Sequence, residues 1–287
     1  LKPATTYTYS VTDLYADVSL SDVTFVTPDA ESTSVRFAHV SDSQVGVTNM
    51  TTAAKTGTFF GRVLKQVVAD GNDFVVHTGD VVEWSKYEDF WQNMLDENFD
   101  CLSVIPVQAI SGNHETTYKN GINETYKHFS YAMPDQPTVT GFYYSFSYAD
   151  VKFIMLNTNR LNNNALTDDQ YNWLEGQLKN KTEKWTVVAM HNPVYSAGTY
   201  GSKPGKTAVS DKLKTQLGKI FAEYGVDIVL QGHDHCVSRT YPINGNQMPT
   251  ADTTEIYDGI EYSVDPQGVI YVMNGPAGNQ VAGRLYA

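Results

Sequence analysis

From residue 35 onward, the sequence alternates between short apolar runs and longer stretches with helical spacing. Residues 35–40 and 74–77 are apolar runs of the kind found in buried strands. The segment 54–69 between them places apolar side chains at helical intervals and stops at Gly71. Repeated strand–helix–strand units favour a sheet of largely parallel strands covered by helices. We therefore predict an α/β domain over this part of the chain.

The same pattern continues to the C-terminal part of the chain. A Thr-Asp-Asp-Gln sequence at 167–170 has the form of a capping box and predicts the start of a helix. The expected architecture is a layered α/β sandwich of two mixed β-sheets flanked by helices. Further strands are expected at 104–110, 142–148, 151–156, 185–190, 226–230 and 269–273, and further helices at 87–97, 171–178 and 211–224.

The first residues follow a different pattern. Polar and apolar side chains alternate at 6–11 and 22–26, which predicts two strands. They resemble the last hairpin of a fibronectin type III sandwich, which would need about seven strands in all. We expect residues 1–32 to be a partial fibronectin-III-like segment with its linker, and residues 33–287 to form the main domain.

Charge limits the classes of ligand. With 32 acidic and 20 basic side chains the formal net charge is −12, so the overall field repels nucleic acid and anionic membranes. No nucleic-acid-binding patch and no membrane span are expected, because neither a basic cluster nor a long apolar run is present. A phosphate-bearing ligand would need a strong local cation. Cys101 and Cys236 are interpreted as two buried, unpaired thiols, although one disulfide between them is possible.

Five of the expected strands end in polar or histidine-containing segments. Parallel strands bring such segments to one edge of a sheet, where α/β proteins bind their ligands. Turn formation explains one such segment but not five in succession. The segments begin at Asp42-Ser43-Gln44, Gly79-Asp80, Gly112-Asn113-His114-Glu115, His191-Asn192-Pro193 and Gly232-His233-Asp234-His235.

These side chains have the chemistry of metal ligands. Imidazole nitrogens mixed with carboxylate and amide oxygens suit iron, zinc or manganese. The set is too large for one ion, whereas two ions sharing one carboxylate would use it fully. The sequence therefore predicts a centre of two metal ions, whose identity stays open.

The order of the five segments resembles the motif blocks of the calcineurin-like metallophosphoesterases, across residues 33 to about 275. Together with the preceding hairpin, the chain looks closest to bacterial members of the purple-acid-phosphatase-like group. The resemblance implies the metallophosphatase fold and makes residues 33–287 a catalytic domain.

The resemblance also implies residue roles. Asp80 would bridge the two ions, and Asp42 with His235 would bind the first. The second would be bound by Asn113, His191 and His233. His114 would lie outside the metal shell and give a hydrogen bond or proton to the departing oxygen, and Glu115 would orient the His114 ring.

Two positions depart from the family pattern. Gln44 stands where the first block usually has a metal-binding histidine, and Glu83 stands where purple acid phosphatases have a metal-binding tyrosine. Both are possible ligands, so the ligand count at the first ion stays open and the iron–tyrosinate chromophore should be absent.

The expected activity is hydrolysis of a phosphate ester by a hydroxide bridging the two ions, most simply as a phosphomonoesterase acting on a phosphorylated small molecule. Asn113, His114, Tyr118 and Tyr195 are candidate substrate contacts. Two alternatives stay open: a phosphodiesterase for cyclic nucleotides or phospholipid head groups, and a non-catalytic surface-binding module with a degenerate metal site. An extracellular or cell-surface location is expected from the resemblance alone.

Overall fold

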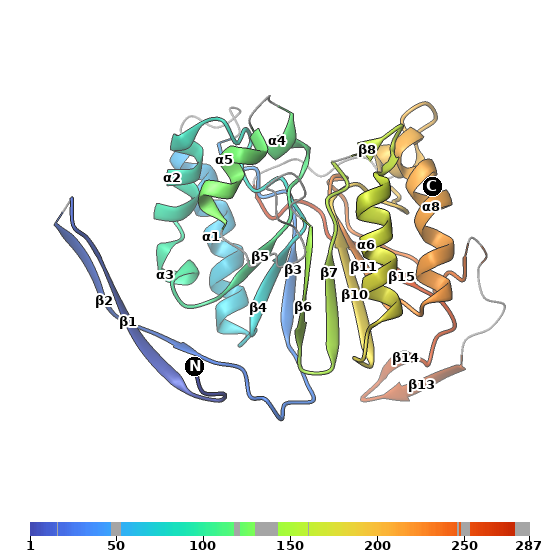
Figure 1. The fold of residues 1–287 in the computed structure, drawn as a ribbon, viewed down its shortest axis with the longest axis horizontal. Coiled ribbons are helices and arrows are strands. Elements are labelled where there is room, and N and C mark those ends of the chain that lie inside the picture. Colours follow the sequence, from blue (N-terminus) through green and yellow to red (C-terminus); the bar gives the residue numbers. More distant parts are fainter. Residues whose placement is uncertain are drawn as a thin grey trace.

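Two β-sheets lie face to face in the computed structural model, which describes residues 1–15, 17–46, 53–117, 121–129, 143–159, 161–245, 247 and 253–278 (Figure 1). The smaller sheet has the strand order β3-β4-β5, and its three strands are parallel. Its strands are β3 (Phe37–Val40), β4 (Phe74–His77) and β5 (Val107–Ala109).

The larger sheet has the order β12-β15-β11-β10-β7-β6. Its four inner strands are parallel, and the edge strands β6 and β12 run antiparallel to their neighbours, so this sheet is mixed. The strands are β6 (Tyr144–Tyr148), β7 (Val151–Met155), β10 (Trp185–Met190), β11 (Ile228–Gln231), β12 (Ser238–Arg239) and β15 (Ile270–Met273).

Helices cover the outer faces of both sheets, which gives helix, sheet, sheet and helix layers (Figure 1). The helices on the side of the smaller sheet are α1 (Ala53–Ala69), α2 (Glu88–Asp96), α3 (Phe99–Leu102) and α5 (Gly121–His128). The larger sheet is covered by α6 (Asp168–Lys179) and α8 (Ala208–Glu223). The expected layered α/β sandwich is confirmed.

Apolar side chains join the two sheets. Phe37 and Phe74 of the smaller sheet pack their rings against Phe153 of β7, with ring centroids 5.1 and 5.2 Å from that ring. A second apolar core lies between the smaller sheet and its helices, and a third lies between the larger sheet and its helices. The sheets are therefore fixed relative to each other, and so are the loops at their edges.

Two hairpins extend from the sandwich (Figure 1). The first pairs β1 (Thr6–Asp13) with β2 (Val18–Val26), and the expected N-terminal hairpin is thus present. Its Tyr9 hydroxyl donates to the Ser103 carbonyl oxygen at 2.9 Å. The second pairs β13 (Thr253–Tyr257) with β14 (Ile260–Val264). The domain boundary at residue 32 stays a prediction.

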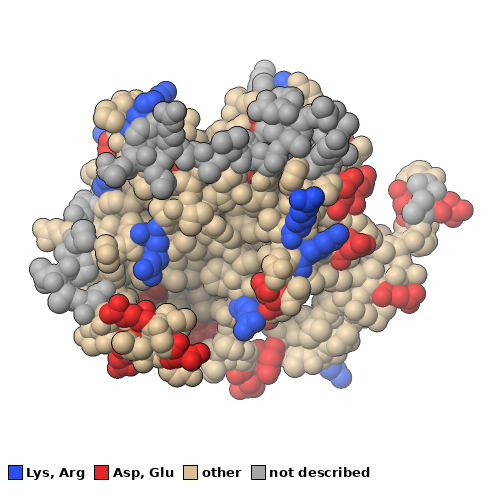
Figure 2. All heavy atoms as spheres, turned by 180° about the vertical axis from the view of Figure 1, so that it is seen from behind, with Lys and Arg blue, Asp and Glu red and all other residues tan. Residues whose placement is uncertain are grey.

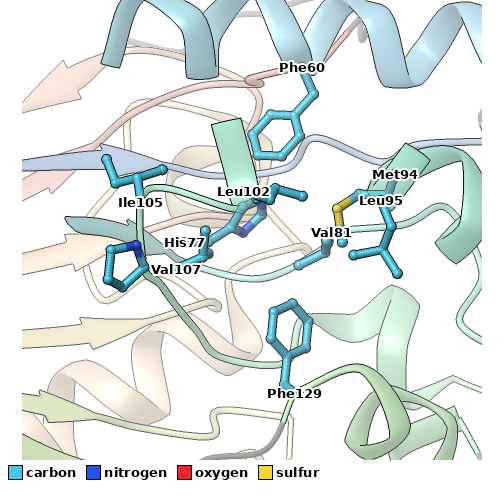
Figure 3. A pocket seen from close by; sticks show the side chains of 10 residues that line it. Phe60, His77, Val81, Met94, Leu95, Leu102, Ile105, Val107 and Phe129 are labelled. Atoms are coloured by element: carbon cyan, nitrogen blue, oxygen red, sulfur yellow. The ribbon is translucent and has the colours of Figure 1, made fainter. Parts of the chain in front are cut away.

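An apolar cavity of about 210 Å³ lies within the helical layer over the smaller sheet (Figure 3). Phe60, Met94 and Phe129 are among its lining side chains. Cys101, in the same core, and Cys236 are both buried and unpaired. No helix in the described ranges is long and apolar enough to cross a membrane.

Local details differ from the sequence-based expectations. The capping box is not formed: the Thr167 hydroxyl makes no capping hydrogen bond, and the Gln170 amide bonds to the backbone of Asn157 through both of its ends. The strand expected at 104–110 is limited to 107–109, since the chain before it forms α3 and a turn. The short elements α4 (Asn113–Thr116), α7 (Thr199–Ser202), β8 (Leu161–Asn162) and β9 (Ala165–Leu166) had no clear sequence pattern.

Candidate metal centre

The motif segments meet at the carboxyl ends of the parallel strands, where both sheets contribute loops. The loop after β3 pairs with the loop after β4 through backbone hydrogen bonds from Asp42 to Gly79 and from Gln44 to Asp80, of 3.0 and 2.9 Å. Asp42 and Asp80 both have φ of 54°, and His233 has φ of 72°. Such left-handed conformations are costly for residues other than glycine and are found often at functional sites.

Glycine is required beside these carboxylates. A Cβ at Gly112 would collide with the Asp80 carboxylate, and one at Gly79 would lie 2.8 Å from Nδ1 of His191. Both glycines belong to the motif segments. Their lack of a side chain lets the loops after β4 and β5 approach each other.

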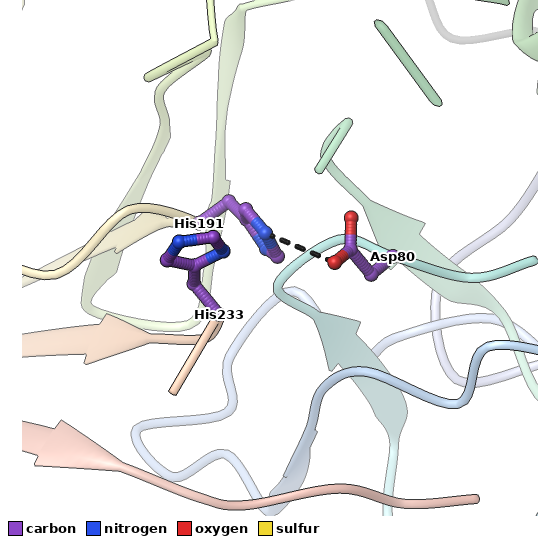
Figure 4. A group of neighbouring side chains, drawn as sticks. All are labelled: Asp80, His191 and His233. Atoms are coloured by element: carbon purple, nitrogen blue, oxygen red, sulfur yellow. Dashed lines mark ion pairs between the residues drawn. The ribbon is translucent and has the colours of Figure 1, made fainter. Parts of the chain in front are cut away.

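One compact cluster combines Asp80, His191 and His233, whose candidate ligand atoms lie within 4.8 Å of one another (Figure 4). Nε2 of His191 lies 3.3 Å from Asp80 Oδ2 and 3.0 Å from Asn113 Oδ1. The Nδ1–H of His191 donates to the Thr78 carbonyl oxygen at 2.8 Å. That bond directs Nε2 of the neutral ring toward the cluster, as in many metal-binding histidines.

A second group lies around Asp42, which is fully buried. Its Oδ1 lies 3.4 Å from Nε2 of His235. Its Oδ2 accepts hydrogen bonds from the Ser41 hydroxyl and from the His233 backbone N–H, the latter at 3.0 Å. Asp42 is thereby held with one oxygen toward His235.

The protonation states show that this site favours positive charge. Burial would lower the pKa of His191, but the Asp80 carboxylate raises it to about 9. Burial likewise opposes ionisation of Asp80, yet His191 holds the pKa of Asp80 below its ordinary value. Burial and the charge of His191 lower the pKa of His233 to about 4. A bound cation would supply this positive charge without the proton on His191.

The buried acceptors fit cations as well. Among the described residues, Asp42 Oδ1, Gln44 Oε1 and Glu83 Oε2 are buried and have no hydrogen-bond partner. Unsatisfied buried acceptors are rare because each costs about 1–3 kcal/mol. The face in Figure 2 carries both acidic and basic side chains. The donor set and these acceptors therefore fit a pair of metal ions.

His114 lies at the edge of the cluster. Its Nδ1 lies against the Glu83 carbonyl oxygen, and its Nε2 is 3.0 Å from Nε2 of Gln44 and 3.8 Å from Asp80 Oδ2. Its ring stacks on Trp84, with centroids 4.5 Å apart. These contacts fix the imidazole in the wall of a cavity of about 270 Å³, which is also lined by Gln44, Asp80, Asn113, Thr199, Tyr200, His233, Asp234 and His235.

The expected contact between Glu115 and the His114 ring is not formed. The Glu115 carboxylate is buried and accepts backbone N–H groups from Asp80, Val81, Val82 and Gly112 at 2.7–3.3 Å. Burial raises the pKa of Glu115 to about 7, while these four donors favour its charged form. Glu115 therefore positions the Asp80 loop, and Glu83 with Gln44 positions His114.

Tyr195 does not reach the cavity. Its ring packs against Tyr271 at 4.7 Å and lies under the Lys214 ammonium group. Tyr118 lies outside the described residues. Two further histidines lie beside the site: His39 is hydrogen-bonded to Thr78, and His77 is hydrogen-bonded to Ser43.

Sequence reasoning did not identify Tyr200 and Asp234. The Tyr200 ring lies 4.1 Å from that of His233 and is 40% exposed. The buried Asp234 carboxylate accepts the backbone N–H groups of Tyr200 and Gly201 at 3.1 and 3.2 Å. The position of Asp234 between two motif histidines could have identified it as a site residue. Tyr200 lies on the short α7, and no sequence pattern around it indicates a role in the site.

A family profile described as Calcineurin-like phosphoesterase matches residues 35–237, which is more than half of the chain. The chain belongs to this family. Its residues 42, 80, 113, 191, 233 and 235 all fall within the matched range.

Curated relatives of this phosphoesterase include plant purple acid phosphatases. Purple acid phosphatase 15 of Arabidopsis thaliana is 26% identical over 67% of this chain and 32% of its own length. Purple acid phosphatase 23 of the same plant is 26% identical over 97% of this chain and 61% of its own length. The chain thus spans about a third to three fifths of the relatives that it matches here.

A solved structure shows the same fold. Purple acid phosphatase PPD1 from yellow lupin (Lupinus luteus) seeds superposes with a TM-score of 0.79 at 19% identity, over 99% of this chain and 52% of that one. The α/β metallophosphatase fold of this chain, with its N-terminal hairpin, is thereby established.

Proposed function

We propose that this phosphoesterase is a phosphomonoesterase that uses two metal ions. The observation that carries the proposal is the convergence of Asp80, Asn113, His191 and His233 beside a cavity in a chain of this family. The names of the plant relatives support a phosphatase activity.

The donor groups divide into two sets that share Asp80. Asp42 and His235 would hold the first ion, while Asn113, His191 and His233 would hold the second. When bound, the two ions would neutralise phosphate charge and lower the pKa of a water molecule at the site. Iron, manganese and zinc all suit this set of donors.

The chain's own residues would then orient the ester. Asn113 and His114 line the cavity, so both can hydrogen-bond oxygens of a phosphate group. Nε2 of His114 faces the cavity-lining groups, and His114 would assist the departing oxygen from there. Tyr200 would contact the organic part of the substrate.

A panel of phosphate monoesters and diesters tests the activity. Metal-loaded protein should hydrolyse monoesters with a clear preference over cyclic nucleotides and phospholipid head-group diesters. A preference for diesters would overturn the monoesterase assignment.

The variant His114→Ala tests the assistance given to the leaving group. Turnover of alkyl phosphates should fall about 100-fold or more, because a positioned acid matters most for a poor leaving group. Turnover of a nitrophenyl phosphate should fall much less, since nitrophenolate leaves unaided. His128→Ala is a matched control, because His128 stacks on Trp91 outside this cavity. Equal losses on both substrates would contradict the role.

A secreted or cell-surface location and a bacterial origin follow only from the motif resemblance, and both remain proposals.

A further inference from the structure

Gln44 occupies the place at which the metal-ligand pattern of this chain departs from its family. Its side chain is 4% exposed and lines the cavity at the cluster. Its backbone has φ of 38° and is fixed to the Asp80 carbonyl oxygen by a 2.9 Å hydrogen bond. A buried glutamine in this strained loop must satisfy both ends of its amide.

The contact with His114 shows which end of the Gln44 side-chain amide is the NH₂ group. A carbonyl oxygen only accepts, so Nδ1 of His114 carries the proton that is donated to the Glu83 carbonyl. In the neutral ring, Nε2 is then an acceptor. The group 3.0 Å from it must be a donor, which is the NH₂ of Gln44.

The oxygen end of the amide therefore faces elsewhere. Oε1 of Gln44 is buried and has no hydrogen-bond partner among the described residues. Asp42 Oδ1, two residues earlier, meets no hydrogen-bond donor in the described part of the chain other than Nε2 of His235, which is 3.4 Å away. A bound cation would give the Gln44 oxygen its missing partner and would take the negative charge of Asp42.

We propose that Gln44 binds the first metal ion through Oε1 while its NH₂ holds the neutral His114 ring before substrate binds. The ring that assists a departing oxygen carries a proton on Nε2, so it gives up this hydrogen bond from Gln44. This inference rests on the proposed pair of ions and specifies their chemistry. An imidazole at position 44 would offer the ion a nitrogen and could not supply the same amide donor to Nε2 of His114.

The two ion positions would then differ in character. Asp42, Gln44 and Asp80 give the first position three oxygen donors with a single nitrogen from His235. The second position has two imidazole nitrogens, from His191 and His233, with the oxygens of Asp80 and Asn113. Oxygen donors suit Mn²⁺ better than imidazoles do, so loss of the Gln44 oxygen should weaken Mn²⁺ binding at the first position and leave the second position unchanged.

Metal content tests this without any substrate. Chelator-treated protein is titrated with Mn²⁺ alone, because Zn²⁺ at the same concentration would displace Mn²⁺ from either position, and bound metal is measured by mass spectrometry. The unaltered chain should bind about two equivalents of Mn²⁺. Gln44→Ala should weaken the binding of one equivalent by about tenfold and leave the other unchanged.

The variant Gln44→Glu separates the two halves of the proposal. It keeps an oxygen ligand and should therefore retain manganese, but it has no NH₂ to donate to His114. Imidazole ¹⁵N shifts of chelator-treated protein should show the Nδ1-protonated ring in the unaltered chain and lose this signature in Gln44→Glu. Circular dichroism of each variant verifies folding.

Two results would overturn the inference: unchanged affinity for both equivalents of Mn²⁺ in Gln44→Ala, or an unchanged His114 signature in Gln44→Glu. Metal content as expected in a protein that hydrolyses no phosphate ester would reject the proposed function instead.

Discussion

At the scale of single residues, the site depends on buried side-chain acceptors that bind the backbone N–H groups of its loops. Glu115 takes four backbone N–H groups from the two loops that present Asp80 and Asn113. Sequence reasoning placed Glu115 beside His114 because the two are adjacent in one motif. The N–H groups that Glu115 binds occur in every residue but proline and leave no mark in a sequence, so the contact was not predictable.

Replacing Glu115 should destabilise the fold as well as the site. In Glu115→Ala, four buried N–H groups lose their acceptor, so the free energy of unfolding should fall by about 3 kcal/mol or more. Urea unfolding of chelator-treated protein measures this loss without a contribution from bound metal. The exposed Glu223 of α8 provides the control, since Glu223→Ala should change stability by no more than about 0.5 kcal/mol. Similar losses in both variants would contradict the role of Glu115.

At the scale of elements, regular strands place the site and short segments shape it. The apolar runs of β4 and β10 were predictable to the residue, because buried parallel strands are continuous apolar runs. The motif segments after those strands were located for the same reason. The four-residue α7 has no periodicity to detect, and its position depends on Asp234, which is far away in sequence.

The α7 segment should influence substrate affinity through Tyr200. Tyr200→Ala removes an exposed ring from the cavity wall, so KM for an aryl phosphate should rise about three- to tenfold, the value of one aromatic contact. Tyr200→Phe should behave like the unaltered chain. Tyr241→Ala is a control of the same chemistry, because Tyr241 is 72% exposed and does not line the cavity. If KM is the same in Tyr200→Ala and Tyr241→Ala, Tyr200 does not contact substrate.

At the scale of the whole molecule, two sheets joined by phenylalanines hold together loops that are far apart in sequence, such as those of Asp42 and His233, which are 191 residues apart. The net charge of −12 repels a phosphate ester, so the site needs its own cations. The strand pattern and motif order predicted the architecture and the site edge. The packing of Tyr195 into the core and the orientation of the Gln44 amide depend on tertiary contacts and were not predictable.

Buried neutral histidines should make the fold sensitive to acid. Burial lowers the pKa of His77 to about 4, even though Asp42 and Asp80 act in the other direction. Its Nδ1 accepts the Gly79 N–H and its Nε2–H donates to Ser43, so a second proton would break the Gly79 bond. His39, with a pKa lowered to about 3 by burial, adds to the effect.

The sign follows from the unfolded chain, in which these histidines have a pKa of about 6.5 and are protonated first. The contribution of these two histidines should be complete above this pH and should fall as the pH drops toward 4, with about 3 kcal/mol from His77. Unfolding of chelator-treated protein between these pH values measures the slope, and His77→Gln should flatten it. An equal slope in this variant would assign the acid sensitivity to other groups.

We propose that one cluster at the edge of both sheets holds the cations needed to hydrolyse a phosphate monoester. Monoester hydrolysis is followed while chelator-treated protein is titrated with Mn²⁺ or Zn²⁺. We expect no hydrolysis before metal is added, a rise that saturates at about two equivalents of metal, and no rise in Asp80→Asn. Hydrolysis that is independent of added metal, or that is unchanged in Asp80→Asn, would contradict the proposal.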